Sequence, residues 1–505
     1  MLRALAYDSG NAQLLNRTLM LVAGDGRHRK AVEIARRLDA VDPGNGMALL
    51  VLAVDAVKRD ALDEAEALLA RLPTRGLSTI TGPLLRAWAD AARGDTSAAL
   101  KQIEALRNRT GFGVLYSLHA GLINDLGGRV EAARTHLEEA LKLAGQPTLR
   151  LVWLVGNFYE RTGEPDRAIA LYESFLERNP DSMVIAAARR RAKAGTAPAV
   201  ADARAGFAET LFNIASLLSQ ERAEEVALIH VQLALRLRPD FVIARVLLGE
   251  ILQSQNRSRA AIDIYRAVPA DSPFSWMVGL RIAAELEGLD LVDEAVAELE
   301  ELAAREPTRY EPLVRLGNLL RNRERFAGAV DAYDRAVARI GKPARRHWTI
   351  YYFRGIALER LSRWRRAEQD FLFALELEPE QPFVMNYLAY TWVEKKRNLD
   401  QAKGMLKRAV ELRPDDGFIV DSLGWVFYRL GEYGKGVKYL ERAVELRPQD
   451  PVINDHLGDA YWSVGRSQEA RFQWRRALSL KPEPDAIPQI ETKIKRGLKD
   501  KPENI

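Results

Sequence analysis

The 505-residue chain contains no cysteine. This absence excludes disulfide bonds, thiolate zinc sites, iron–sulfur clusters and cysteine nucleophiles. No apolar run approaches the roughly 18–20 residues that span a bilayer. The first residues also lack the basic region and apolar core of a secretory signal. The sequence as it stands therefore predicts a soluble chain.

An excess of one charge is also missing. Lys and Arg number 74 against 69 Asp and Glu, which leaves a net charge of +5. Spread over such a length, this charge gives no reason to expect nucleic acid or an anionic membrane as the main partner.

Catalytic and cofactor signatures are absent too. The chain has no His-Glu-x-x-His, no Gly-x-Ser-x-Gly and no phosphate-binding Gly-x4-Gly-Lys-Ser/Thr motif. None of its six histidines forms a ligand pair at i, i+4. We therefore expect no enzyme activity, no cofactor and no metal site.

What the sequence does contain is a period of 34 residues. A small residue recurs with steps that are mostly 34 or 35, at Ala31, Ala65, Ala99, Ala133, Ala168, Ala227, Ala261, Ala295, Ala329, Ala367, Ala402, Gly436 and Ala470. A second small residue lies twelve positions earlier in most units, a bulky residue four positions later, and often a proline twelve positions later.

This spacing predicts a repeated helix–turn–helix. Spacings of 3, 4 and 7 place residues on one helix face. Small residues at facing positions allow two antiparallel helices to approach closely, and the bulky residue fills the space beside them. The proline ends the second helix because it has no N–H to donate. A single unit cannot bury its apolar face alone, so the units must stack.

The pattern resembles the tetratricopeptide repeat. The clearest matches are Asp421–Gly431 followed by Pro448, and Asn454–Trp462 followed by Pro482. The resemblance implies an all-α, right-handed α-solenoid of about 13 helix pairs. The early repeats depart from the pattern, since no proline closes the units near Leu106.

The C-terminal third is similar to a narrower group. Met385–Trp392, Asp421–Gly431 and Asn454–Trp462 resemble large envelope tetratricopeptide proteins of proteobacteria. That group includes an outer-membrane lipoprotein adaptor of a carboxyl-terminal processing protease, and its members usually begin with an export signal. Ala4–Asp8 matches the end of a second helix, so the chain opens in mid-repeat. If the N-terminus is truncated, the resemblance implies a periplasmic or outer-membrane-associated protein; otherwise the chain is cytoplasmic.

Two lobes are expected from the one long interruption of the period. Residues 1–183 form a first array of about five repeats, and residues 207–482 a second array of about eight. The Ala/Arg-rich insertion 184–206 reads as a helical extension plus a flexible linker. Alternatively, it offers a basic docking strip of Arg189, Arg190, Arg191 and Lys193. Residues 483–505 are expected to form a basic capping helix and tail.

The predicted partner-binding surface lies on the first helices of the last four repeats. In this family, positions 2, 5, 9 and 12 of the first helix face the concave groove. In the last four repeats these positions hold Thr349, Tyr352, Ile356 and Glu359, then Phe383, Asn386, Tyr390 and Val393, then Phe418, Asp421, Trp425 and Tyr428, and finally Val452, Asp455, Asp459 and Trp462. Among them we predict ten partner-binding residues: Tyr352, Phe383, Asn386, Tyr390, Asp421, Trp425, Tyr428, Asp455, Asp459 and Trp462. Exposed Tyr and Trp suit peptide binding, and the aspartates favour basic or N–H-rich segments. Alternatively, several of these residues pack against neighbouring helices or the C-terminal cap.

The sequence thus predicts a non-enzymatic scaffold or adaptor that binds a partner protein or peptide in its concave groove. The narrower resemblance extends this to assembly of an envelope complex. One alternative is a helical-repeat RNA-binding protein, which needs a strongly basic groove, whereas this groove carries aspartates. Another is a non-catalytic subunit of an enzyme complex.

Overall fold

The computed structural model describes residues 10–498. These residues form 28 α-helices and two short 3-10 helices, and no strand occurs among them. Within the same range, no helix is both long and apolar enough to cross a membrane. The expected half-repeat at Ala4–Asp8 lies outside the described residues.

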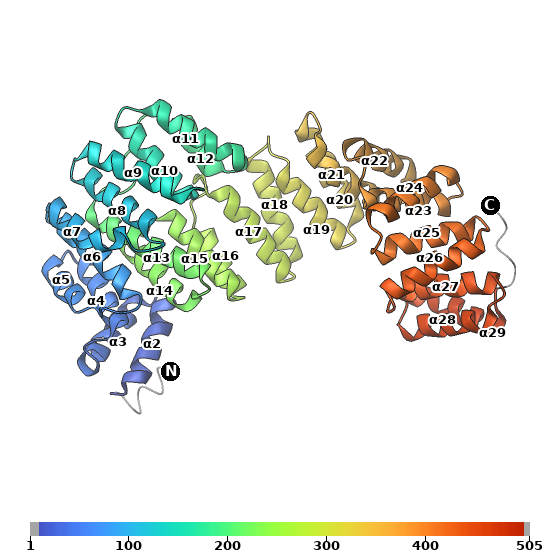
Figure 1. The fold of residues 1–505 in the computed structure, drawn as a ribbon, viewed down its shortest axis with the longest axis horizontal. Helices are drawn as coiled ribbons and strands as arrows, with labels where there is room; N and C mark the ends of the chain where they lie inside the picture. Colours follow the sequence, from blue (N-terminus) through green and yellow to red (C-terminus); the bar gives the residue numbers. More distant parts are fainter. Residues whose placement is uncertain (1–9, 499–505) are drawn as a thin grey trace. The chain divides into compact units, whose positions relative to one another are not determined.

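The chain divides into two compact units, Met1–Glu298 and Leu299–Ile505. Figure 1 shows each as a succession of antiparallel helices. Helices of unit 1 are α2 (Ala12–Gly24), α3 (His28–Val41), α4 (Gly46–Lys58), α5 (Leu62–Ala70), α6 (Ser78–Ala92), α7 (Thr96–Arg107), α8 (Gly113–Leu126), α9 (Val130–Ala144), α10 (Leu149–Arg161), α11 (Pro165–Arg178), α12 (Met183–Arg191), α13 (Ala203–Gln220), α14 (Glu224–Leu237), α15 (Val242–Ser254), α16 (Ser258–Arg266) and α17 (Ser275–Gly288). Helix α18 (Val292–Arg305) contains the boundary.

Unit 2 continues the same arrangement. Its helices are α19 (Glu311–Asn322), α20 (Phe326–Ile340), α21 (Trp348–Arg360), α22 (Trp364–Leu377), α23 (Pro382–Glu394), α24 (Leu399–Leu412), α25 (Gly417–Arg429), α26 (Tyr433–Leu446), α27 (Pro451–Ser463), α28 (Ser467–Ser479) and α29 (Ile487–Arg496). The 3-10 helices η1 (Arg345–His347) and η2 (Pro484–Ala486) precede α21 and α29.

The all-α solenoid expected from the 34-residue period is confirmed. Twelve helix pairs, from α2/α3 to α27/α28, each lie wholly within either unit 1 or unit 2. In each pair the two helices pack against one another. Every small residue of the repeat register lies on the second helix of a pair and is buried. The sequence period therefore corresponds to one packed helix pair.

A glycine on the first helix meets a large side chain on the second in many pairs. A Cβ at Gly355 would lie 2.7 Å from the ring of Phe371, and one at Gly424 would lie 2.7 Å from Cγ of Leu440. Neither position has room for a larger residue. The close helix approach inferred from the small residues is thus present, and the bulky residue lies against the glycine itself.

Unit 1 has a feature that the period does not reveal. Helix α13 packs against α6 and α8, and helix α14 packs against α2 and α4. Helices α2, α4, α6 and α8 are the first helices of four successive pairs, whose surface would otherwise form a concave face. Figure 1 shows α13 and α14 beside these helices. The sixth pair therefore fills the groove of the first four.

Polar contacts anchor this pair in place. Arg150 donates from Nε to Oε1 of Glu209 at 3.0 Å, and both side chains are buried. Trp88 is fully buried against Gly206 and donates to Nδ1 of His119 at 3.1 Å. Burial lowers the pKa of His119 to about 4, so this imidazole is neutral.

The insertion is what brings the chain back to that groove. The structure differs from the expected flexible linker, because Ala199 and Val200 are buried. Asn157 donates to the carbonyl of Ala197 at 3.0 Å and accepts from the Ala199 N–H at 2.9 Å. Residues 184–206 therefore lie inside unit 1, and the boundary between the compact units falls instead at Glu298/Leu299.

The basic strip expected in this insertion is largely paired. Arg189 lies 3.2 Å from Glu173, and Lys193 lies 3.2 Å from Asp166. Arg191 is partly buried and faces the ring of Trp153 at 5.9 Å. These side chains do not form one continuous basic surface.

Two glycines of unit 2 test the close helix contact. Gly424→Ala should cost about 1–3 kcal/mol, because its methyl group would overlap Leu440. Gly404 is an exposed helix residue with nothing within 4 Å of an added Cβ. Gly404→Ala should therefore stabilise by roughly 0.5–1 kcal/mol. Urea unfolding of both variants gives the comparison, and equal effects of the two substitutions would contradict the close contact.

A second prediction concerns the filled groove of unit 1. Residues 193–198 are mostly exposed, so limited trypsin digestion should cut near Lys193. Because α13 and α14 pack against α2–α8, the two fragments should elute together and separate only in denaturant. Separation under native conditions would contradict the packing described above.

Candidate functional site

The first helices of the last repeats lie side by side in unit 2. Helix α25 contacts both α23 and α27. Helix α21 meets α23 through Tyr352 and Tyr387, whose ring centroids are 6.2 Å apart. The predicted partner-binding residues therefore do lie on adjacent helices.

One row of side chains on these helices is exposed. Phe383, Phe418 and Val452 are the second residues of α23, α25 and α27, and their exposed fractions are 39%, 49% and 52%. We call these three residues the apolar row. The guanidinium of Arg413 lies 5.3 Å from the ring of Phe383, and that of Arg447 lies 4.9 Å from Phe418. The row is thus apolar with basic side chains against it.

Helix caps fix the start of each helix at the apolar row. Asp416 accepts a hydrogen bond from the Phe418 N–H at 3.1 Å, and Asp450 accepts one from the Val452 N–H at 2.9 Å. Gln381 caps α23 in the same way. An N-cap side chain satisfies the free amides of a first helical turn, so the position of each helix start is set locally.

Deeper in the surface, Trp425 belongs to a stacked cluster. Its ring lies 3.9 Å from that of His456, with 16° between the planes, and it also stacks on Tyr428. Its Nε1 donates to Glu394 at 2.8 Å. His456 Nδ1 lies 3.0 Å from Asp421 Oδ1. Trp425 is therefore half-buried and fixed by packing on one face.

Asn386 and Tyr390 follow Phe383 along α23. Oδ1 of Asn386 is buried and has no hydrogen-bond partner among the described residues. Burial raises the pKa of Tyr390 above its ordinary value, and the nearby Glu394 adds to that shift. The Tyr390 hydroxyl is therefore neutral and can donate a hydrogen bond.

The C-terminal helix covers the end of the surface. Lys493 of α29 donates to Asp455 at 2.7 Å and to Asp459 at 2.8 Å. Burial raises the pKa of Asp459 to about 6. Trp462 packs between Trp474 and the end of this helix. The last repeat is thus closed by the chain itself.

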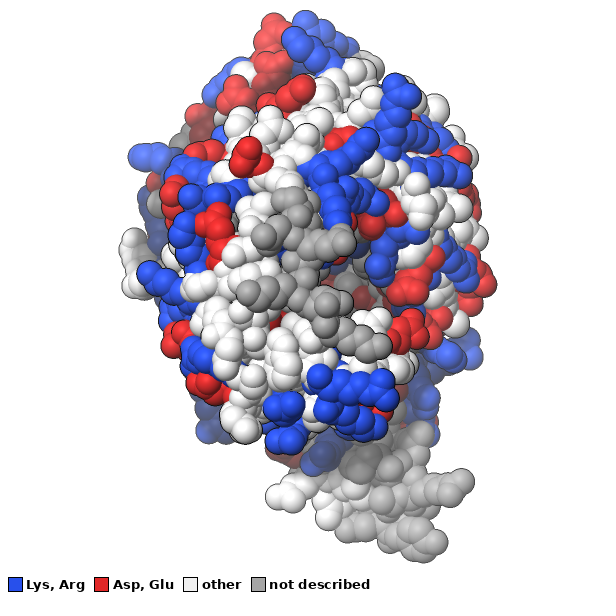
Figure 2. All heavy atoms as spheres, turned by 90° about the vertical axis from the view of Figure 1, so that its right-hand side faces the viewer, with Lys and Arg blue, Asp and Glu red and all other residues white. Residues whose placement is uncertain are grey.

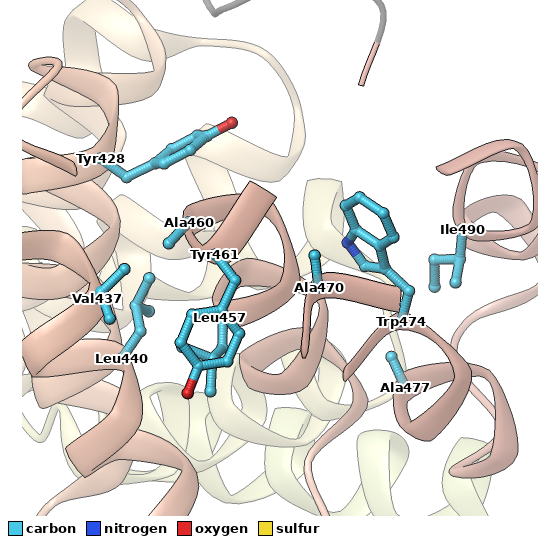
Figure 3. Packing of buried hydrophobic residues seen from close by; sticks show 10 residues of the cluster. All are labelled: Tyr428, Val437, Leu440, Leu457, Ala460, Tyr461, Ala470, Trp474, Ala477 and Ile490. Carbon is cyan, nitrogen blue, oxygen red and sulfur yellow. The ribbon is translucent and has the colours of Figure 1, made fainter. Parts of the chain in front are cut away.

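Figure 3 shows the core beneath this end. Tyr428, Leu457, Trp474 and Ile490 are buried in one cluster, with Ile490 supplied by α29. Trp474 also donates from its indole to Asp459 at 2.8 Å. Tyr428 is therefore a core residue.

The ten predicted residues accordingly fall into two groups. Tyr352, Phe383, Asn386, Tyr390 and Trp425 are partly or substantially exposed. The remaining five take part in internal packing or ion pairs: Asp421, Tyr428, Asp455, Asp459 and Trp462. The sequence predicts that these aspartates attract a basic ligand. In the structure His456 already faces Asp421, and Lys493 already faces Asp455 and Asp459.

The repeat spacing places Phe418 and Val452 at the same groove-facing position as Phe383, but of these three only Phe383 is among the ten predicted binding residues. His456 was not predicted at all, since its stacking on Trp425 depends on how α27 turns against α25. No local sequence signal reveals that contact.

Comparisons with known proteins agree with the repeat. Family models described as tetratricopeptide repeat match residues 149–194, 280–345, 393–451 and 453–484. A TPR repeat-containing protein of Pseudomonas aeruginosa is 25% identical over 200 residues, which are 38% of this chain and 32% of that protein. The alignment thus covers about a third of the length of this curated relative.

Solved structures of tetratricopeptide proteins are also similar. A protein from Parabacteroides merdae matches with a TM-score of 0.40 and 14% identity, over 49% of this chain and 96% of that chain. The APC/C hetero-tetramer Cut9–Hcn1 matches with a TM-score of 0.39 and 14% identity, over 98% of both chains. At these scores we conclude nothing about function from either structure.

The buried His456 predicts a pH dependence. Burial would lower the pKa of His456, but Asp421, with help from Asp455 and Asp459, raises it above 6.5. A raised pKa means that this group stabilises the fold below pH 6.5, and that its contribution is lost as pH rises through the folded-state pKa. Urea unfolding from about pH 6 to about pH 9 should show this loss, and His456→Gln should diminish it.

A matched control is available in unit 1. Burial lowers the pKa of His28, so His28→Gln should leave the decline above pH 6.5 unchanged. If His456→Gln and the unsubstituted chain lose stability equally over that range, the contact between His456 and Asp421 does not cause the loss of stability.

Proposed function

We propose that this chain, which contains tetratricopeptide repeats, is a non-enzymatic scaffold that binds a partner protein through the first helices of unit 2. The observation that carries the proposal is the apolar row of Phe383, Phe418 and Val452. These three large apolar side chains occupy one position of successive repeats and leave 39–52% of their surface exposed. Exposed apolar groups arranged together are typical of protein interaction sites.

The groups beside the row define the chemistry of the partner. Arg413 and Arg447 stand against the two phenylalanines and are exposed, so they favour acidic over basic side chains in the bound segment. Asn386 is partly exposed, so its side-chain amide can hydrogen-bond the backbone of an extended segment. We therefore propose an extended partner segment with apolar side chains flanked by acidic ones.

Unit 2 is favoured over unit 1 for this role. The first helices of the first four pairs in unit 1 are covered by α13 and α14. In unit 2, α29 covers only the last repeat. The proposed binding surface accordingly consists of α21, α23, α25 and the start of α27.

RNA binding finds no support on the visible face. Figure 2 shows basic and acidic side chains interspersed around uncharged ones. A protein that follows a phosphate backbone needs a continuous basic surface. The resemblance to envelope adaptors is the sole support for a role in an envelope complex, and we include that role in the proposal only as its setting.

The test uses the exposed row. A photo-crosslinking residue placed at Phe418 should capture the partner, and the same residue at Leu372 should not. Leu372 is the matched control, since it is 40% exposed but lies on the second helix α22. With the partner purified, Phe383→Ser and Phe418→Ser should each weaken binding by about 1–2 kcal/mol, and Leu372→Ser should have no effect.

Stability must be measured on the same variants. Because the row is exposed, each serine substitution should change unfolding free energy by roughly 0.5 kcal/mol or less. Equal losses of binding for the row variants and for Leu372→Ser would show that the partner does not use this surface.

A further inference from the structure

Unit 1 contains a cavity of about 190 Å³ that the proposed scaffold function does not use. It lies between α10, α12 and the segments that precede α15 and α17. Trp153, Phe241 and Phe274 supply aromatic walls, and Val184 and Ile243 add apolar ones. An apolar cavity of roughly 150 Å³ is large enough to hold benzene, so this cavity can hold a substituted aromatic ring.

Three guanidinium groups also line the cavity. Arg150 is matched by the buried Glu209 through two hydrogen bonds. Arg238 donates to the carbonyl of Ala199 at 2.9 Å, and its nearest carboxylate is the exposed Asp240 at 3.6 Å. Burial and the nearby Arg150 lower the pKa of Arg238.

Arg191 is the third, and no hydrogen-bond acceptor or carboxylate pairs with it among the described residues. Its Nε is inaccessible to solvent and makes no hydrogen bond among the described residues. It also has no ion pair within that part of the chain, although its neighbours Arg189 and Lys193 both do. A guanidinium with an unsatisfied buried N–H is a costly feature in a folded protein.

The aromatic walls hold these cations without using their N–H groups. The guanidinium of Arg150 lies 4.8 Å from the ring of Trp153 and 4.9 Å from that of Phe241. That of Arg238 lies 4.8 Å from Phe241, and that of Arg191 lies 5.9 Å from Trp153. Stacking on a ring face leaves the planar N–H edge of a guanidinium able to bind a carboxylate.

We propose that this cavity binds a carboxylate that carries an aromatic group. The ring would occupy the apolar part beside Trp153 and Phe241, and the carboxylate would accept hydrogen bonds from Arg191 and Arg238. A free aromatic acid and the terminal Phe of a peptide share this chemistry. The site uses residues of unit 1 alone, so it is independent of the apolar row.

Calorimetric titration of the full chain tests the proposal. Phenylacetate should bind saturably with a Kd on the order of 1 mM, as expected for so small a ligand. Phenylacetamide has the same ring without the charge and should bind at least about tenfold more weakly. A hexapeptide ending in Phe, compared with its C-terminal amide, tests the peptide source. If phenylacetate binds more tightly than the hexapeptide acid, the ligand is a free aromatic acid; if the hexapeptide acid binds more tightly, the ligand is a peptide terminus. Either result supports the site.

Four variants locate the site. Arg191→Gln and Arg238→Gln should each weaken phenylacetate binding by about tenfold. Arg189→Gln lies on the same helix but outside the cavity, and should leave binding unchanged. Asp240→Asn removes the carboxylate among the lining residues and should strengthen binding by about twofold. Asp240 is largely exposed, so this substitution should leave the fold intact.

Thermal unfolding of each variant separates binding from folding. Equal binding of phenylacetate and phenylacetamide would overturn the proposal, because the cavity would then recognise only the ring. No saturable binding of phenylacetate, or an unchanged affinity in both Arg191→Gln and Arg238→Gln when these are folded, would also overturn it.

Discussion

The contact between a small residue on the first helix of a pair and a large side chain on the second determines this structure. At Gly355 and Gly424 there is no space for even one more methyl group. Because interiors are close-packed, that contact fixes the distance between the two helices. The spacing of the pairs then decides which residues of the first helices reach the surface. The apolar row of unit 2 follows from this geometry, since its members share one repeat position and differ only in the repeat that carries them.

The two units use their first helices in opposite ways. In unit 1 the chain turns back and covers four of them with α13 and α14. In unit 2 they remain uncovered until α29 closes the last repeat through Lys493. One repeated sequence pattern therefore yields a self-filled groove in one unit and an open surface in the other. The insertion 184–206 makes the difference, because it supplies the length of chain needed for the return. The same return creates the arginine-lined cavity beside α10.

Sequence periodicity was sufficient for the helices but not for the contacts between distant repeats. The register of Ala329 or Ala402 follows from spacing alone, and these residues are buried as predicted. The filling of the unit 1 groove depends on the direction of the chain after α12, which no local pattern encodes. Asp455 and Asp459 were predicted to attract a ligand, but whether a carboxylate is free depends on its neighbours in space. Lys493, 38 and 34 residues later in the sequence, is the neighbour that decides it.

The return of α13 and α14 also affects how the protein can be made. A repeat solenoid ordinarily forms contacts between neighbours in sequence, which favours rapid, local folding. Here Gln232 bonds to Gly24 across 208 residues, and Arg257 bonds to Asp25 across 232. At a synthesis rate of about 5–20 residues per second, the inner face of the first four pairs waits several seconds on the ribosome for the segment that covers it. Unit 1 therefore cannot complete its fold until α14 has been synthesised, whatever the earlier repeats have already formed.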